Sequence, residues 1–327
     1  MDEGDRAARG LSPADSPAGP HAADQAVRGD PLVSAFWAIG AATLLLMAFG
    51  ATVRVHGAGL ACPDWPLCFG QLVPQMDFRI FLEWGHRLVA GLISVVFLVA
   101  GVLVLRDPRR RALAGGLVIA AAVTLLAQIV LGGLTVLHLL AQWTVTSHLL
   151  AANVFLAFVL LIGRRLRQGG RAALGPGPVA VRVSTGLLAF ATLVQLVLGG
   201  VVSSSYAGLV CTEWPTCFGG VWFPTFAGLI GLQVLHRLGA YAVVLIAIAN
   251  AALVWNDTAL RRPAALFLVL VVVQVVLGVA NVILSLPVEL AVLHSLVADG
   301  LFQTAIWLAV GASTSTLIAA PADSKVA

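Results

Sequence analysis

Charged residues are scarce in this chain. Asp, Glu, Lys and Arg make up 10% of its 327 residues, whereas apolar residues make up 60%. Soluble globular domains have about 25% charged and about 45–50% apolar residues, so the composition excludes a soluble protein and indicates a polytopic membrane protein. The net charge of +4 does not indicate nucleic-acid binding, because the basic residues form short clusters between apolar runs. Membrane orientation produces that distribution.

The N-terminal stretch lacks an apolar run. Residues 1–33 are rich in Ala, Gly, Pro and Asp. They lack the apolar core of a cleavable signal peptide, and they contain several acidic residues, which transit peptides rarely have. We expect residues 1–33 and 313–327 to be cytoplasmic tails, the first of them disordered.

Long apolar runs dominate the remaining sequence. A helix needs about 20 apolar residues to cross a bilayer. Eight segments qualify, at roughly 34–53, 84–105, 113–136, 144–163, 183–203, 230–254, 264–286 and 290–312. The breaks at 138–143 and 287–289 are the two tightest and predict antiparallel hairpins. The expected fold is an all-α integral membrane protein with eight transmembrane helices.

Lys and Arg predict the orientation. Most of the 19 basic residues fall in one set of loops, and the other set holds only Arg54, Arg79, Arg87 and Arg237. The positive-inside rule therefore places both termini in the cytoplasm and the loops at 54–82 and 204–229 outside the cell (plasma) membrane.

The two halves of the sequence resemble each other. HGAGLACPDWPLCFG (56–70) matches YAGLVCTEWPTCFGG (206–220), and QIVLGG, QLVLGG and QVVLGV recur in three odd-numbered helices. Because each half has four helices, the second half re-enters the membrane from the same side, which predicts a parallel repeat. We expect four-helix halves at 34–163 and 183–312, joined by a cytoplasmic linker at 164–182, and each bundle has an interior that can hold a site.

All four cysteines lie in the outward loops, two in each: Cys62, Cys68, Cys211 and Cys217. Paired cysteines on an oxidising side of a membrane are expected to form disulfides. Spacing leaves the connectivity open, although a bridge within each loop is the natural expectation. A structural staple and a redox role both remain open, and a metal site is less favoured because the pairs stand on separate halves.

Four histidines recur in two equivalent pairs. His86, His148, His236 and His294 fall near the outer starts of helices two, four, six and eight. An ionisable residue inside a membrane indicates a functional site by default. Two imidazoles facing each other across a bundle core can ligate a haem iron axially. Interhelical hydrogen bonding is the alternative, and repetition of the pair in both halves favours haem.

The repeat is imperfect beside the first histidine of each pair. Glu83 lies three residues before His86 on the same helix face, and the matching residue of the second half is Gln233. A carboxylate can move protons or stabilise positive charge, and a carboxamide cannot do so near neutral pH. The first half is therefore the candidate chemical site, and the second is predicted to bind a non-reactive haem.

Other polar residues have weaker assignments. Arg87 and Arg237 directly follow histidines and could bind haem propionates or extend to the membrane interface. Asn153 and Asp299 lie deep enough to need a partner. His56 and His138, in the outward loops, are expected to be structural.

Together these features resemble the haem A synthase family of membrane enzymes. The resemblance covers about residues 34 to 312 and rests on the eight spans, GLACPDWPLCFG, the E-x-x-H-R sequence at 83–87 and the three further histidines in order. It implies oxidation of a ring methyl of haem O to a formyl group, through a hydroxymethyl intermediate, which matures the haem A cofactor of cytochrome oxidases.

The resemblance also implies roles for individual residues. His86 and His148 would hold the substrate haem with Glu83 as the catalytic carboxylate, while His236 and His294 would ligate a haem b that passes electrons. The first-loop cysteines would be linked to catalysis. Haem O synthase and a quinone or other electron acceptor are the expected partners besides membrane lipid.

Two other classes remain as alternatives. A membrane b-type cytochrome that only transfers electrons would carry two permanent haems and would not need Glu83. A transporter is suggested by the internal duplication. It would have broken helices at mid-membrane, whereas the polar residues here cluster at the outer edge. A haem-binding enzyme accounts for more of the sequence than either alternative does.

Overall fold

The computed structural model describes residues 30–169 and 176–314. It contains eight long helices, all apolar enough to cross a membrane. They are α2 (Pro31–Val55), α3 (Phe78–Arg106), α4 (Pro108–Leu137), α5 (Gln142–Gln168), α6 (Val179–Ser204), α7 (Gly228–Val254), α8 (Arg261–Ile283) and α9 (Val288–Ala312), with a short 3₁₀ turn η2 (Ala207–Leu209). The all-helical fold class and the eight predicted spans are confirmed, and the protein is a multi-pass membrane protein. Residues 1–29 and 315–327 of the predicted tails at 1–33 and 313–327, and residues 170–175 of the linker, lie outside the described residues.

Local sequence explains where several helices begin. The side chains of Asp30, Asp77 and Asp107 accept hydrogen bonds from the first-turn N–H groups of α2, α3 and α4. Such caps satisfy amides that have no partner inside the helix. Proline occupies the first position of α2 and of α4, where its missing N–H has no cost.

The tightest connection joins α3 to α4. Arg106 ends α3 and Pro108 begins α4, so that Asp107 alone separates the two helices. The expectation that the breaks at 138–143 and 287–289 are the tightest is therefore wrong. Asp107 ends one helix and caps the next, so the three arginines at 109–111 belong to α4 rather than to a loop.

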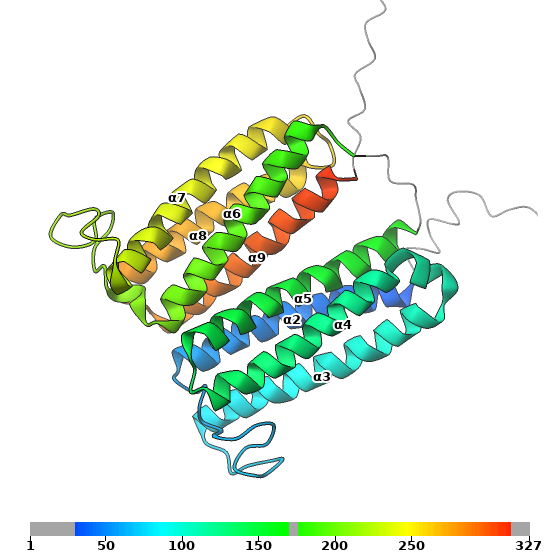
Figure 1. The fold of residues 1–327 in the computed structure, drawn as a ribbon, viewed down its shortest axis with the longest axis horizontal. Helices are drawn as coiled ribbons and strands as arrows, with labels where there is room; N and C mark the ends of the chain where they lie inside the picture. The colour runs from blue at the N-terminus through cyan, green and yellow to red at the C-terminus, as the bar shows by residue number, and fades with distance from the viewer. Residues whose placement is uncertain (1–29, 170–175, 315–327) are drawn as a thin grey trace, which may run out of the picture.

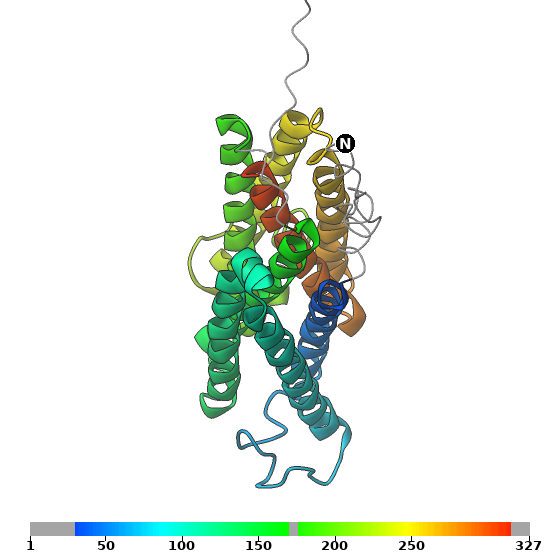
Figure 2. The same ribbon diagram turned by 90° about the vertical axis from the view of Figure 1, so that its right-hand side faces the viewer.

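The helices pack as two sets of four (Figure 1). In the first set, α2, α3, α4 and α5 form a closed ring of neighbours, and α6, α7, α8 and α9 form a ring in the same order. The sets meet through α2 and α5 on one side and α6 and α9 on the other. The loops between α2 and α3 and between α6 and α7 project from the same end of the molecule, and Figure 2 shows the first of them extending beyond the helix ends.

Each set has its apolar core at the end opposite these loops. In the first set the core includes Phe36, Phe97 and Ile162, and in the second it includes Leu188, Phe267 and Leu308. Phe97 packs edge-on against both Phe36 and Phe155, a geometry that aromatic rings favour. The loop end of each bundle is where the four histidines lie.

Candidate active site

The histidines of each pair come from helices that lie across a bundle from each other. His86 is on α3 and His148 on α5, while His236 is on α7 and His294 on α9. Both helices of each pair belong to the same ring of four helices. The structure thus brings together the residues that the sequence paired.

A glycine of the neighbouring helix lies against each imidazole. A Cβ atom added to this glycine would lie 3.0 to 3.2 Å from the Cε1 atom of the ring. The pairs are Gly50 with His86, Gly132 with His148, Gly199 with His236 and Gly278 with His294. Because the glycines lack a side chain, each ring can approach the helix backbone closely. All four helices of each set therefore contribute to its site.

Glutamines bond three of the four imidazoles. The amide nitrogen Nε2 of Gln128 lies 3.3 Å from Nε2 of His148, and that of Gln274 lies 3.2 Å from Nε2 of His294. Nε2 of Gln195 lies 3.1 Å from Nδ1 of His236. Sequence reasoning recorded the repeated QxVLG segments without giving the glutamines a role. In each segment the glycine that packs against the imidazole follows the glutamine by four residues, and this constant spacing could have identified the glutamines.

The histidine nitrogens have the chemistry that a haem iron requires. The Nδ1 atoms of His86, His148 and His294 are buried and have no hydrogen-bond partner among the described residues, while the four side chains are only partly buried. Neutral imidazoles are common axial ligands of haem iron, for which the protein supplies two donors. The residues present in each half therefore fit a haem.

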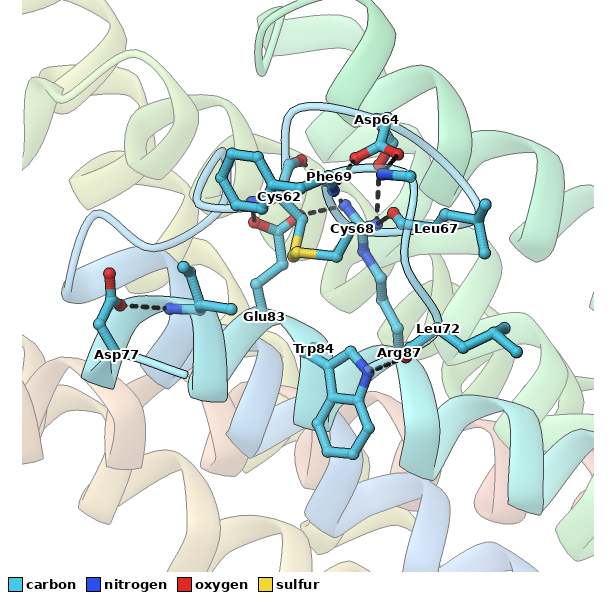
Figure 3. Close-up of a disulfide and its surroundings, with 12 residues drawn as sticks. Cys62, Asp64, Leu67, Cys68, Phe69, Leu72, Asp77, Glu83, Trp84 and Arg87 are labelled. Carbon is cyan, nitrogen blue, oxygen red and sulfur yellow. Dashed lines mark hydrogen bonds and ion pairs between the residues drawn. A yellow bond between two sulfur atoms is a disulfide. The ribbon is translucent and has the colours of Figure 1, made fainter. Parts of the chain in front are cut away.

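Glu83 is joined to the first cysteine loop (Figure 3). The residue is 4% exposed, and its Oε2 atom accepts a hydrogen bond of 2.8 Å from the backbone N–H of Cys62. Its Oε1 atom forms an ion pair with Arg87. Arg87 also donates to the carbonyl oxygens of Cys62, Asp64 and Leu67. These contacts fix the carboxylate between the start of α3 and the loop.

Each cysteine pair is bridged within its own loop, as expected. Cys62 bonds Cys68, and Cys211 bonds Cys217. In the first loop the indole of Trp65 also covers Gly133, where an added Cβ would lie 3.1 Å from the ring. Gly133 directly follows Gly132, so the first loop extends from Glu83 on α3 to the part of α4 that packs against His148.

The second half replaces the carboxylate with a weaker polar contact. Nε2 of Gln233 donates to the carbonyl oxygen of Gly208 at 3.3 Å. Arg237 donates to the carbonyls of Cys211 and Thr216, much as Arg87 does in the first loop. The second loop is thus held to its helix by an arginine, and the buried carboxylate that Arg87 pairs with has no counterpart at the Gln233 position.

An acidic residue organises each cysteine loop. Asp64 accepts hydrogen bonds from the N–H groups of Phe69 and Gly70, and the bond from Gly70 is the main cause of the lowered pKa of its carboxyl. Glu213 accepts from the hydroxyl of Thr216, which is the main cause of its lowered pKa, and from the two glycine N–H groups that follow Phe218. Both loops therefore depend on an ionised carboxylate.

The remaining predicted polar residues have local or interhelical partners. His56 is the C-cap of α2, with its Nδ1 atom 2.9 Å from the carbonyl oxygen of Thr52, and His138 is the C-cap of α4. Asn153 donates from α5 to Asp299 on α9 at 2.8 Å, across the boundary between the two sets. Each of these two deep residues thus supplies the partner that the other was expected to need.

Comparison with known proteins agrees with this arrangement. The family model described as cytochrome oxidase assembly protein (COX15-CtaA) matches residues 35–80 and 75–306. The chain is 29% identical over 299 residues to the heme A synthase of Shewanella oneidensis, which covers 77% of this chain and 88% of the relative. It is 28% identical over 320 residues to that of Methylobacterium radiotolerans, with 80% and 84% covered. These matches confirm the family resemblance seen in the sequence, and the chain belongs to the COX15-CtaA family of cytochrome oxidase assembly proteins.

Proposed function

We propose that this membrane enzyme is a haem A synthase, which oxidises a ring methyl of haem O to a formyl group. One observation carries the proposal. A buried carboxylate, Glu83, lies three residues before His86 in one of two otherwise matching histidine sites, and it is fixed there by Arg87 and the N–H of Cys62. Two equivalent electron-transfer haems would not require that difference. The curated relatives named heme A synthase support the same reaction.

The two sites have different tasks in this proposal. His86 and His148 hold the substrate haem O, and His236 and His294 ligate a haem b. Bound haem b supplies one-electron redox chemistry. The residues of the first half would orient the substrate so that its reacting methyl can reach Glu83, which the cysteine loop and Arg87 hold in place.

The chemistry balances as two successive two-electron oxidations of the methyl group. The first produces a hydroxymethyl group and the second a gem-diol, which loses water to leave the formyl. Written with water as the oxygen source, a methyl and one water give a formyl with four protons and four electrons. Glu83 accepts a proton or stabilises positive charge on the reacting carbon. A quinone or another acceptor takes the electrons.

The arginines support propionate binding to different degrees. Within the described residues, both terminal nitrogens of Arg87 are used by loop carbonyls and Glu83. A guanidinium group has five N–H donors, so Arg87 has one remaining at Nε. Arg237 makes two such bonds and has three donors remaining. We assign propionate binding more readily to Arg237.

The proposal includes an orientation and a setting. The plasma membrane is the proposed location, and the positive-inside distribution supports an orientation with both termini in the cytoplasm and the cysteine loops outside. An oxidising outer side accounts for the two bridges. Haem O synthase, which supplies the substrate, is the expected partner in the pathway.

Pigment analysis tests the function. Wild type and Glu83→Gln are expressed in a host that makes haem O, and extracted haems are identified by mass. Wild type should yield haem A, and Glu83→Gln should stop at haem O or its hydroxymethyl derivative. Glu289→Gln, the same change at an exposed residue of α9, is the matched control and should behave as wild type. If all three proteins carry only haem b while haem O is available, the protein is an electron-transferring cytochrome instead.

A further inference from the structure

The four histidine positions share a construction that has one exception. On α4, α6 and α8 a glutamine stands four residues before the glycine that packs against the imidazole, at Gln128, Gln195 and Gln274. On α2 the same position, four residues before Gly50, holds Leu46. Accordingly the ring of His86 makes no hydrogen bond among the described residues, and its Nδ1 atom is buried without a partner.

The glutamines have an unused acceptor as well as a donor. In each of them the Oε1 atom is buried and has no partner in the described structure, although the Nε2 atom contacts an imidazole nitrogen. An imidazole that gives one nitrogen to iron keeps an N–H on the other. Rotation of the Gln128 or Gln274 amide would present Oε1 to that N–H and give both of these groups a partner.

Such a bond affects how firmly a histidine holds iron. An acceptor on the distal N–H fixes the ring orientation and raises the basicity of the ligating nitrogen, and its loss commonly costs about 10–100-fold in metal affinity. Gln195 differs, because its Nε2 atom also donates to the backbone carbonyl of His236 at 2.9 Å, and rotation of its amide would break that bond. A leucine side chain has no acceptor, so Leu46 cannot hold His86 in this way.

We propose that Gln128 and Gln274 are positioning residues that hold haem-ligating histidines, and that His86 is the exchangeable ligand through which the first half releases its haem. This inference rests on the proposed function, in which haem must enter and leave the first half and remain in the second. His148 provides a fixed ligand on one side of the substrate. His86, on the same helix as Glu83, provides the weak ligand on the reacting side.

Haem transfer measures this difference without requiring haem A formation. The full-length protein in detergent is loaded with ferric haem b and mixed with excess apomyoglobin, and the Soret spectrum follows haem loss. His148→Ala and His294→Ala identify the phases that belong to the first and second halves. Wild type should lose haem rapidly from the first half and slowly from the second.

Reciprocal substitutions then test the glutamine position. Leu46→Gln should slow loss from the first half by about tenfold, and Gln274→Leu should speed loss from the second by about 10–100-fold. Leu45→Gln adds the same amide to the neighbouring residue of α2, which is 67% exposed, and should change neither phase. Because one variant adds the contact and the other removes it, a folding defect in either leaves the other informative.

The outcomes separate this inference from the proposed function. If the protein binds no haem, both fall. If haem binds in both halves but Leu46→Gln behaves as Leu45→Gln does and Gln274→Leu retains haem normally, the assignment of the glutamines is wrong and the proposed function stands. If haem A never forms but the two phases respond as described, the glutamine assignment stands and the synthase proposal fails.

Discussion

The two sets of helices share histidines, glycines and bridged loops, yet differ at three matched positions around their sites. One half has a carboxylate, a leucine and a glycine where the other has an amide, a glutamine and a valine. The matched residues are Glu83 and Gln233, Leu46 and Gln195, and Gly133 and Val279. All three differences affect polarity or access near a histidine. They suggest one scaffold adapted for turnover in the first half and for retention in the second.

The largest expected effect comes from exchanging the carboxylate. Glu83→Gln should lower haem A formation by at least about 100-fold, because acid–base groups commonly contribute that much or more. The reciprocal Gln233→Glu places a carboxylate beside Arg237 and should leave haem A formation near the wild-type value. Haem A as a fraction of total extracted haem is the measurement. Equal losses of haem A formation in both variants would mean that the catalytic role does not belong to the first half alone.

Removal of either disulfide should lower the stability of the protein by a similar amount, but only removal of the first should lower its activity. Each closes a loop with a sequence separation of 6, so Cys68→Ser and Cys217→Ser should each lower the free energy of unfolding by about 2 kcal/mol. Only Cys68→Ser should also lower haem A formation, because its loop holds Glu83 through the N–H of Cys62. Thermal melting and pigment analysis of the same preparations compare the two. Loss of activity in Cys217→Ser alone would reverse the assignment.

The contact under Trp65 should have a smaller effect. Gly133→Val gives the first half the residue of the second, and the indole of Trp65 must move to accommodate the new side chain, because an added Cβ would lie 3.1 Å from the ring. We expect haem A formation to fall about tenfold, short of the 100-fold that a misplacement of about 1 Å can cost. Val279→Gly is the control and should retain the activity, so a loss there as large as in Gly133→Val would show that the Trp65 contact is not specific.

The smallest effect concerns pH and should be similar in both loops. The pKa values of Asp64 and Glu213 are lowered by hydrogen bonds to their carboxylates. A lowered folded-state pKa contributes stability that is present above the unfolded pKa, about 4, and is lost as pH falls through the folded value. Both disulfides should therefore become more accessible to a reductant effective in acid, such as a phosphine, below about pH 4.

Asp64→Asn distinguishes the loops in that experiment. The amide cannot ionise, so the first loop should lose its pH dependence while the second keeps it. Reduction of each bridge is quantified by alkylation and mass analysis. An unchanged pH response in the variant would show that another group controls the first loop.

Much of the fold and part of the site could be predicted from the sequence. Apolar length predicts the eight spans, because a bilayer sets a minimum length that few other structures need. The matched loops and histidines predict which residues should pair, and Cys62 with Cys68 and Cys211 with Cys217 are bridged accordingly. The one-residue turn at Asp107 was not predicted, because the cluster of arginines that follows it is typical of a loop. In the structure Asp107 caps α4 and Pro108 begins it, as an Asp-Pro pair can do.

The sequence alone determined the membrane class, the helix number and the identity of the four histidines, since these follow from local composition and spacing. Only the tertiary structure decided which groups touch those histidines. Gln128, Gln195 and Gln274 lie 41 residues or fewer from the rings they contact but on different helices, and Glu83 is fixed by the N–H of Cys62, 21 residues before it. Such contacts depend on how each helix is rotated and packed against its neighbours. The length of an apolar run does not specify this, because the lipid and the protein interior are equally apolar and the run does not show which face is buried.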